Sequence, residues 1–187
     1  MTIAAPLDMV LFDPQPDEGI IAPDVLQRAY GCVPSGVVTI CALVDEGDGP
    51  MPMGMVASSF VTVSNDPPLV AFCVQWSSST WPRLSRAPRL GISLLSQEHA
   101  DVAWQIASRS RDRFQGLRTS TTVQGAIFIE EATAWLECTV QSVVDAGDHG
   151  VVLMRVDAVT AAAERAPLVR HGSKFHGLAQ LTESRAA

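Results

Sequence analysis

Short apolar stretches rich in β-branched residues, each closed by a cluster of turn-forming residues, constrain the fold of this chain most strongly. Residues 36–44 read GVVTICALV and end at the turn-rich segment 45–50, after which 51–57 is again largely apolar. Two such stretches on either side of a Gly/Asp/Pro turn are typical of a β-hairpin. Further strands are predicted over 69–74, 90–95, 134–144 and 151–158, with a second hairpin loop at 145–150.

Helical signals are fewer. Pro23 opens a predicted helix over 23–30 that Gly31 ends, and Pro82 lies in the first turn of another over 80–86. A third, over 97–108, places Val102, Ala103 and Ile106 on one face. Because strands outnumber helices and mostly form hairpins, we expect a mainly β protein, an antiparallel and nearly closed barrel with peripheral helices. We expect one domain over 1–187: an irregular arm over 1–22, the barrel over 23–178 and a tail over 179–187.

The composition narrows the class of protein. The chain has 187 residues, 47% of them hydrophobic, and a net charge of -7, which argues against nucleic acid as a partner. No apolar run reaches the roughly 20 residues that span a bilayer, and the N-terminus does not resemble a secretory signal. The sequence therefore predicts a cytoplasmic protein without a membrane partner. The widely spaced cysteines are expected to be reduced and structural, and no spacing predicts a metal site: Cys32, Cys41, Cys73 and Cys138.

Two stretches offer hydroxyls and backbone N–H groups of the kind that a phosphate or the polar edge of another ligand can use. In the first, 54–70, the small residues Gly54 and Ala57 admit close backbone approach, and Ser58 and Ser59 add hydroxyls. On composition alone, a surface connection between two strands is the favoured interpretation of this stretch. In the second, the hydroxyl residues of 77–80 precede a helix start, which favours an anion and would be assisted by Arg83 or Arg86. The alternative is that Ser79 or Thr80 is simply an N-cap.

The order and spacing of these stretches resemble the flavin reductase family with the FMN-binding split-barrel fold. The resemblance runs from about residue 26 to 178 and rests on GMVASSFVTVSNDPPLVAFCV, SSSTWPRL, GISLLSQEHADVAWQIA, AWLECTV, GDH and PLVRHGSKF. It implies an antiparallel Greek-key split barrel, a homodimer, and FMN or FAD reduced by NADH or NADPH. It also implies that reduced flavin is supplied to a partner flavin-dependent monooxygenase.

The resemblance also implies the site residues. Val56, Ala57, Ser58 and Ser59 would line the isoalloxazine and ribityl side, and the wall beside them would be Ser64, Asn65, Pro67 and Pro68. The turn of Ser77, Ser78, Ser79 and Thr80 would hold the flavin phosphate. His149 would lie near the nicotinamide as the catalytic residue. Phe114 would contact the cofactor, and His171 and Phe175 would close the site, against the partner subunit in a dimer.

His149 follows Asp148, whose carboxylate can orient an imidazole, although the pair also suits a hairpin tip. His99 is expected to be a solvated surface residue. Trp76 and Trp81 flank the Ser/Thr turn, where they can pack over the flavin or against the protein, and Trp135 is expected in the core.

Some positions depart from the family pattern: Val56, Ser93, Met154 and Arg170. They leave open a flavin-binding carrier or electron-transfer module without reductase activity, and a split-barrel protein that binds no flavin.

Overall fold

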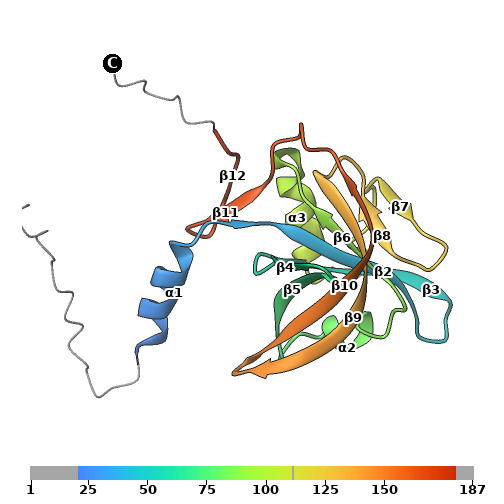
Figure 1. Ribbon diagram of the computed structural model, residues 1–187, viewed down its shortest axis with the longest axis horizontal. Helices are drawn as coiled ribbons and strands as arrows, with labels where there is room; N and C mark the ends of the chain where they lie inside the picture. Colours follow the sequence, from blue (N-terminus) through green and yellow to red (C-terminus); the bar gives the residue numbers. More distant parts are fainter. Residues whose placement is uncertain (1–20, 111, 180–187) are drawn as a thin grey trace, which may run out of the picture.

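The computed structural model describes residues 21–110 and 112–179, and its main element is antiparallel β-sheet (Figure 1). The strands are β1 (Ser35–Gly36), β2 (Val38–Asp45), β3 (Pro50–Ala57), β4 (Val61–Asn65), β5 (Pro68–Gln75), β6 (Leu90–Leu94), β7 (Thr119–Thr121), β8 (Ile127–Ile129), β9 (Ala134–Ala146), β10 (His149–Ala161), β11 (Val169–His171) and β12 (Lys174–His176). The helices are α1 (Pro23–Gly31), α2 (Trp81–Leu84), the 3₁₀ turn η1 (Gln97–His99) and α3 (Ala100–Ala107).

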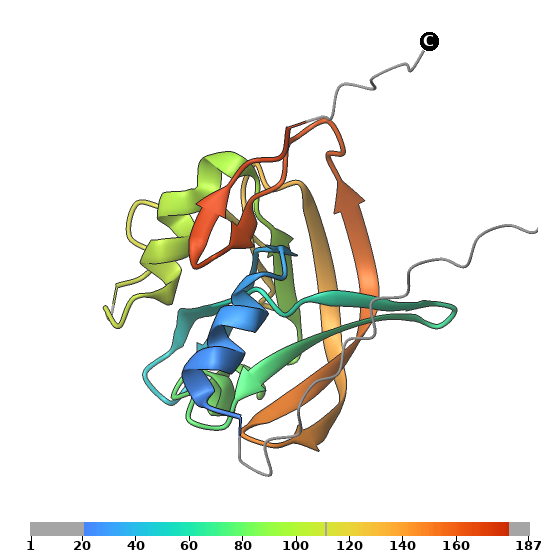
Figure 2. The same cartoon turned by 90° about the vertical axis from the view of Figure 1, so that its left-hand side faces the viewer.

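Seven strands form the central sheet in the order β3-β2-β6-β9-β10-β5-β4. Three antiparallel hairpins make up most of this sheet: β2–β3, β4–β5 and β9–β10. The sheet curls into a barrel that leaves β3 and β4 as its edges, and the long β9–β10 hairpin wraps one side (Figures 1 and 2). Two register shifts within that hairpin allow it to bend. The expected mainly β, antiparallel split barrel is confirmed.

Two apolar clusters hold the barrel together. One fills its interior around Ile40, Phe72 and Leu90, while the other joins the sheet to α3 through Leu95 and Ile106. These side chains are inaccessible to solvent. Successive residues of β2 are buried, because alternate side chains of that strand belong to the two clusters on its opposite faces. The barrel therefore gives the residues at its surface a rigid base.

The structure corrects several expected boundaries. Residues 61–65 form β4, whereas they were expected in a connection; the strand lies at an edge and exposes Val61 and Val63, so it lacks a buried apolar face. The short strands β7, β8, β11 and β12 were not predicted. The helix expected over 97–108 is divided into η1 and α3, and the Ser96 hydroxyl and the His99 ring cap its first turn. Ala103 and Ile106 are buried as expected, with Val102 partly so.

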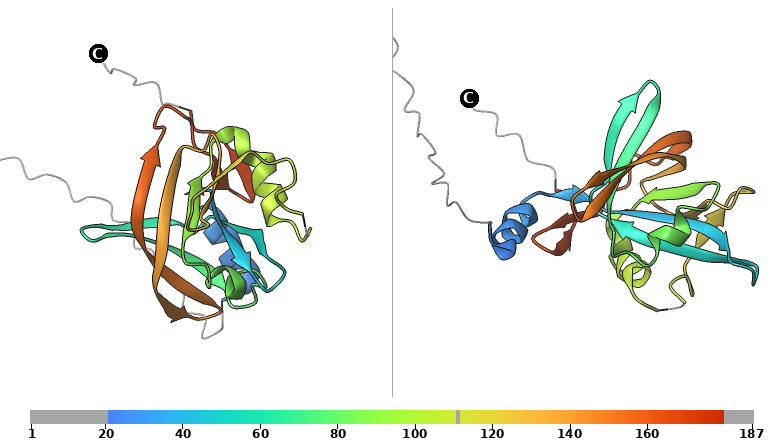
Figure 3. Two further views of the ribbon diagram at one scale, coloured as in Figure 1. Left: turned by 90° about the vertical axis from the view of Figure 1, so that its right-hand side faces the viewer. Right: turned by 90° about the horizontal axis from the view of Figure 1, so that it is seen from below.

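Outside the barrel, α1 buries none of its side chains and stands away from the sheet beside β11 and β12 (Figures 1 and 3). Most of the expected N-terminal arm and C-terminal tail lie outside the described residues, and the division into one domain stays a prediction. Within residues 21–110 and 112–179, none of the helices has both the length and the apolar character needed to cross a membrane.

Candidate functional site

A cavity of about 710 Å³ lies on the barrel surface where the end of β3, the end of β5 and the start of β10 meet the C-terminus of α3. It brings together two expected stretches that are separated by a whole hairpin in the sequence. The expected site residues that line it are Val56, Ala57, Ser58, Ser59, Ser77, Ser78, Ser79, Thr80 and His149.

Hydrogen bonds fix the Ser58–Ser59 side of the cavity. The Ser59 hydroxyl accepts the Cys73 backbone N–H at 2.9 Å and donates to the Cys73 carbonyl at 3.1 Å, which ties this connection to β5. Gly54 serves a different purpose from the one expected. A Cβ there would lie 2.6 Å from Cys41 Sγ and 2.9 Å from Phe114 Cζ, so Gly54 makes room for protein packing rather than for a ligand.

The Ser77–Thr80 turn combines capping with free hydroxyls. Thr80 occupies the N-cap position of α2, as one of the two expected residues, but its side chain makes no capping hydrogen bond. The Ser78 hydroxyl instead accepts the Trp81 backbone N–H at 3.2 Å. Ser77 and Ser79 also line the cavity, and among the described residues neither side chain has a hydrogen-bond partner. The turn is therefore fixed at Ser78 and offers its other hydroxyls to the cavity.

The cations beside this turn come from an unexpected segment. Arg113 Nη1 donates to Thr80 Oγ1 at 3.3 Å and to the Gly54 carbonyl at 3.2 Å, and Arg109 lines the cavity with it. The expected Arg83 instead pairs with Glu46, and Arg86 lines a different cavity. The cluster of arginines in SRSRDRF was the available signal, but only the fold brings it against Thr80.

His149 faces the same cavity from the first position of β10, opposite Gln75. Its Nδ1 lies 2.7 Å from a carboxylate oxygen of Asp148, and this hydrogen bond lowers the pKa of the Asp148 carboxyl. The pair fixes the ring orientation and leaves Nε2 for the cavity.

The two tryptophans beside the turn pack against protein. A Cβ on Gly150 would lie 2.4 Å from the Trp76 ring, which shows that this ring lies directly on the start of β10. Trp81 is buried and meets Phe72 edge-on at 5.3 Å between ring centroids. Trp135 is only partly buried; its ring stacks on Phe128, and its N–H donates to the Ile129 carbonyl at 2.7 Å.

Several expected site residues do not line this cavity in one chain. Ser64, Asn65 and Pro68, with Pro67, lie at the turn of the β4–β5 hairpin, which projects from the barrel (Figures 2 and 3). Phe114 packs behind β3. In the small β11–β12 sheet, Phe175 packs on Trp104 at 5.1 Å and His171 faces His176 at 6.0 Å. Arg170, from β11, does line the cavity.

The four positions that depart from the family pattern divide into two kinds. Ser93 is buried and its hydroxyl accepts the Ile129 N–H at 2.9 Å, while Met154 is part of the barrel core. Only Val56 and Arg170 line the cavity. The first two departures therefore change the packing of the barrel, and the last two change the cavity itself.

Two expectations about single residues are corrected. His99 is buried, because its ring accepts the Ser96 N–H at 3.2 Å in the capping turn, and burial lowers its pKa. Cys41 and Cys138 are buried thiols whose pKa is raised to about 12 by desolvation, but Cys73 is exposed and lines the cavity. All four cysteines are free, as expected. Across the described ranges, no three His, Cys, Asp or Glu side chains gather as metal ligands would.

Comparison with known proteins defines the class. Residues 30–179 match the model of the flavin reductase like domain. A flavin reductase from Pseudomonas putida is 34% identical over 161 residues, covering 86% of this chain and 93% of the relative. The monooxygenase reductase subunit HsaB from Rhodococcus jostii is 30% identical over 141 residues, covering 75% and 71%.

Among solved structures, this chain is similar to the NADH:FAD oxidoreductase SgcE6 from Streptomyces globisporus, in complex with NAD and FAD fragments. The TM-score is 0.76 and the sequence identity is 28%. The match covers 89% of this chain and 99% of SgcE6. The fold and the sequence thus define a flavin oxidoreductase. The chain belongs to the flavin reductase family.

Proposed function

We propose that the protein uses NADH or NADPH to reduce FMN or FAD and that the cavity between β3, β5 and β10 is where this happens. One observation carries the proposal: the fold brings small backbone-exposing residues, a hydroxyl-rich turn, Arg113 and His149 to one cavity. The polar edge of a planar flavin ring can hydrogen-bond to backbone groups that approach it closely, and a flavin phosphate can accept hydrogen bonds from hydroxyls and from a cation.

In this arrangement, residues 56–59 lie along the isoalloxazine and ribityl side. Ser77, Ser79 and Thr80 donate hydroxyl hydrogen bonds to the flavin phosphate, and Arg113, already bonded to Thr80 Oγ1 at 3.3 Å, adds a charge-assisted contact. Val56 offers no hydroxyl, so the ring edge there depends on backbone groups. The same residues therefore orient the flavin and exclude water from one of its faces.

Hydride transfer from nicotinamide C4 to flavin N5 is the chemistry that the two cofactors supply when bound. The protein's part is to hold the rings in stacking distance, which needs no nucleophile. No Asp, Glu or Lys is among the described residues that line the cavity. Held by Asp148 at Nδ1, His149 presents Nε2 to the nicotinamide amide and positions it. Arg170 adds a positive charge for a phosphate of the nicotinamide nucleotide.

Replacing His149 with Ala is expected to raise the KM for NADH or NADPH about 5- to 20-fold while kcat falls less than about threefold, since one positioning hydrogen bond is lost. Steady-state kinetics with saturating flavin measures both constants. Gln124→Ala, at an exposed position that does not line the cavity, is the control and should leave both constants unchanged. Hydride transfer abolished in the saturated complex would contradict a positioning role.

Bound flavin is expected to protect Cys73 from alkylation, because its exposed thiol lines the cavity beside Ser59. Cys32, exposed at the end of α1, should react at the same rate with and without flavin. Peptide mass spectrometry after brief iodoacetamide treatment measures both thiols in one sample. Equal modification of Cys73 in the two samples would show that the flavin binds elsewhere.

We further propose that the protein is a cytoplasmic homodimer that passes reduced flavin to a flavin-dependent monooxygenase. Relatives named as monooxygenase reductase subunits support the partner. The dimer would place against a second copy the turn of one β4–β5 hairpin together with His171 and Phe175, all of which lie off the cavity in one chain.

A further inference from the structure

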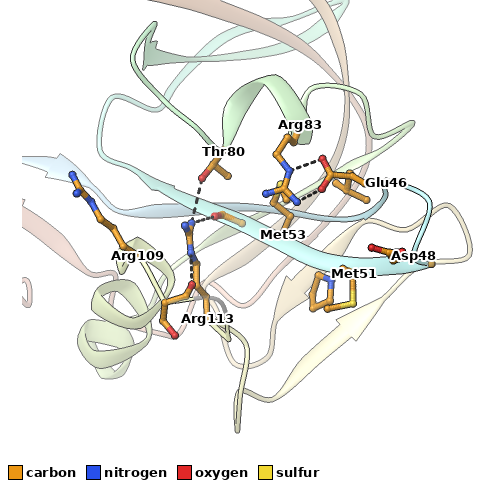
Figure 4. Close-up of a pocket in the computed structure, with 13 residues that line it drawn as sticks. Glu46, Asp48, Met51, Met53, Thr80, Arg83, Arg109 and Arg113 are labelled. Atoms are coloured by element: carbon orange, nitrogen blue, oxygen red, sulfur yellow. Dashed lines mark hydrogen bonds and ion pairs between the residues drawn. The ribbon is translucent and has the colours of Figure 1, made fainter.

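A second cavity, of about 600 Å³, adjoins the candidate flavin cavity (Figure 4). It lies between the β2–β3 hairpin and the segment that follows α3. Thr80, Arg109 and Arg113 line both cavities, so the two meet at the end of the hydroxyl-rich turn. His149 lines only the first cavity. The second cavity therefore extends the first from its proposed phosphate end.

Charge is unevenly distributed along this second cavity. Arg109 and Arg113 lie at the shared end, and Arg113 donates there to the neutral acceptors Thr80 Oγ1 and the Gly54 carbonyl. Farther along, Arg83 Nε donates to Glu46 at 2.6 Å; this bond holds the pKa of the Glu46 carboxyl below its usual value. Asp48 lies beyond that pair, at the hairpin tip (Figure 4). The cavity is thus cationic where it joins the first and acidic at its far end.

Apolar surface lies between these two ends. Met51 and Met53 line the cavity from β3, and Met51 is 60% exposed. Thioether side chains adapt their shape and make favourable contacts with aromatic rings. The volume falls within the roughly 300–1,000 Å³ typical of small-molecule sites.

We propose that this second cavity holds the adenylate half of FAD, so that the protein binds FAD in preference to FMN. The inference rests on the proposed function, because it begins from a flavin phosphate at Thr80. The diphosphate meets Arg109 and Arg113, the adenine ring lies on Met51, and the donor groups of adenosine reach the carboxylates of Glu46 and Asp48. FMN ends at its single phosphate and leaves the second cavity unused.

The competing occupant is the adenosine of NADH or NADPH. The position at which the two cavities meet favours the flavin. The second cavity opens beside Thr80, where the flavin phosphate is proposed to lie, and His149, where the nicotinamide is proposed to lie, does not line it. A nicotinamide nucleotide extends from the His149 end.

The test is to titrate the full-length chain with FAD, FMN and riboflavin by flavin fluorescence. FAD is expected to bind at least about tenfold more tightly than FMN, and AMP should compete with FAD but not with FMN. Met51→Trp, at an exposed position, fills the second cavity and should weaken FAD at least about fivefold while FMN changes less than about twofold. Val123→Trp, which adds the same bulk to a fully exposed residue of a different cavity, is the matched control.

Three results would overturn the inference: FMN binding as tightly as FAD, equal weakening of both flavins by Met51→Trp, or a raised KM for NADH in that variant with FMN as acceptor. If FMN is nevertheless bound and reduced, the proposed function stands and only the adenylate site fails. If neither flavin binds, both fail.

Discussion

Replacing Arg113 with Ala is expected to weaken FMN and FAD binding by about 10- to 100-fold, because a hydrogen bond to a charged group contributes about 1.5–3 kcal/mol. In the wild type, Arg113 lies beside the hydroxyl-rich turn and bonds to Thr80 Oγ1 at 3.3 Å. Riboflavin has no phosphate, so its affinity should change less than about twofold. Fluorescence titration with the three flavins gives the comparison directly.

Two variants give this prediction its controls. Arg113→Lys keeps the charge but not the paired donors and should recover part of the lost affinity. Arg118→Ala removes the same charge from an exposed ion pair with Glu131 and should leave all three affinities unchanged. A riboflavin affinity that falls as far as that of FMN would place Arg113 in the packing of the cavity rather than in phosphate binding.

Replacing Gly91 with Ala is expected to destabilise the barrel by about 3 kcal/mol or more, which lowers Tm by roughly 6–12 °C for a chain of this size. A Cβ at this position would lie 2.2 Å from the backbone oxygen of Ile127. Because β6 is paired with β2 on one side and β9 on the other, its backbone has no free direction in which to move. Thermal unfolding followed by circular dichroism measures the effect.

Gly36→Ala is the control for Gly91→Ala, since nothing lies within 4 Å of a Cβ there. Its Tm should stay within about 2 °C of the wild type. A similar Tm for the two variants would mean that β8 lies farther from β6 than the structure shows.

Local patterns predicted much of the barrel because strong strands carry their own signal. The stretches that became β2, β5 and β9 combine β-branched residues with flanking turns, and packing reinforces that preference. β4 was missed for a physical reason: an edge strand exposes Val61 and Val63, so its pairing with β5 is a tertiary event. His99 was misjudged because its ring turns inward to cap its own turn.

The candidate site was predictable only where its residues are close in sequence. Residues 56–59 and 77–80 were recognised from their small and hydroxyl side chains, and the fold brings them together across β5. Arg113 was missed because it reaches Thr80 across 33 residues of chain, and no local pattern encodes such a contact. The same limit applies to Gly54, whose missing side chain makes room for Phe114 rather than for a ligand.

The central claim is that this chain reduces flavin with a nicotinamide nucleotide, and oxidation of NADH and NADPH at 340 nm with added FMN or FAD tests it most directly. The expected result is flavin-dependent loss of absorbance with at least one nucleotide and one flavin, slowed in Arg113→Ala at subsaturating flavin. Flavin that binds, as shown by fluorescence, but supports no oxidation of either nucleotide would contradict the claim and indicate a carrier module instead.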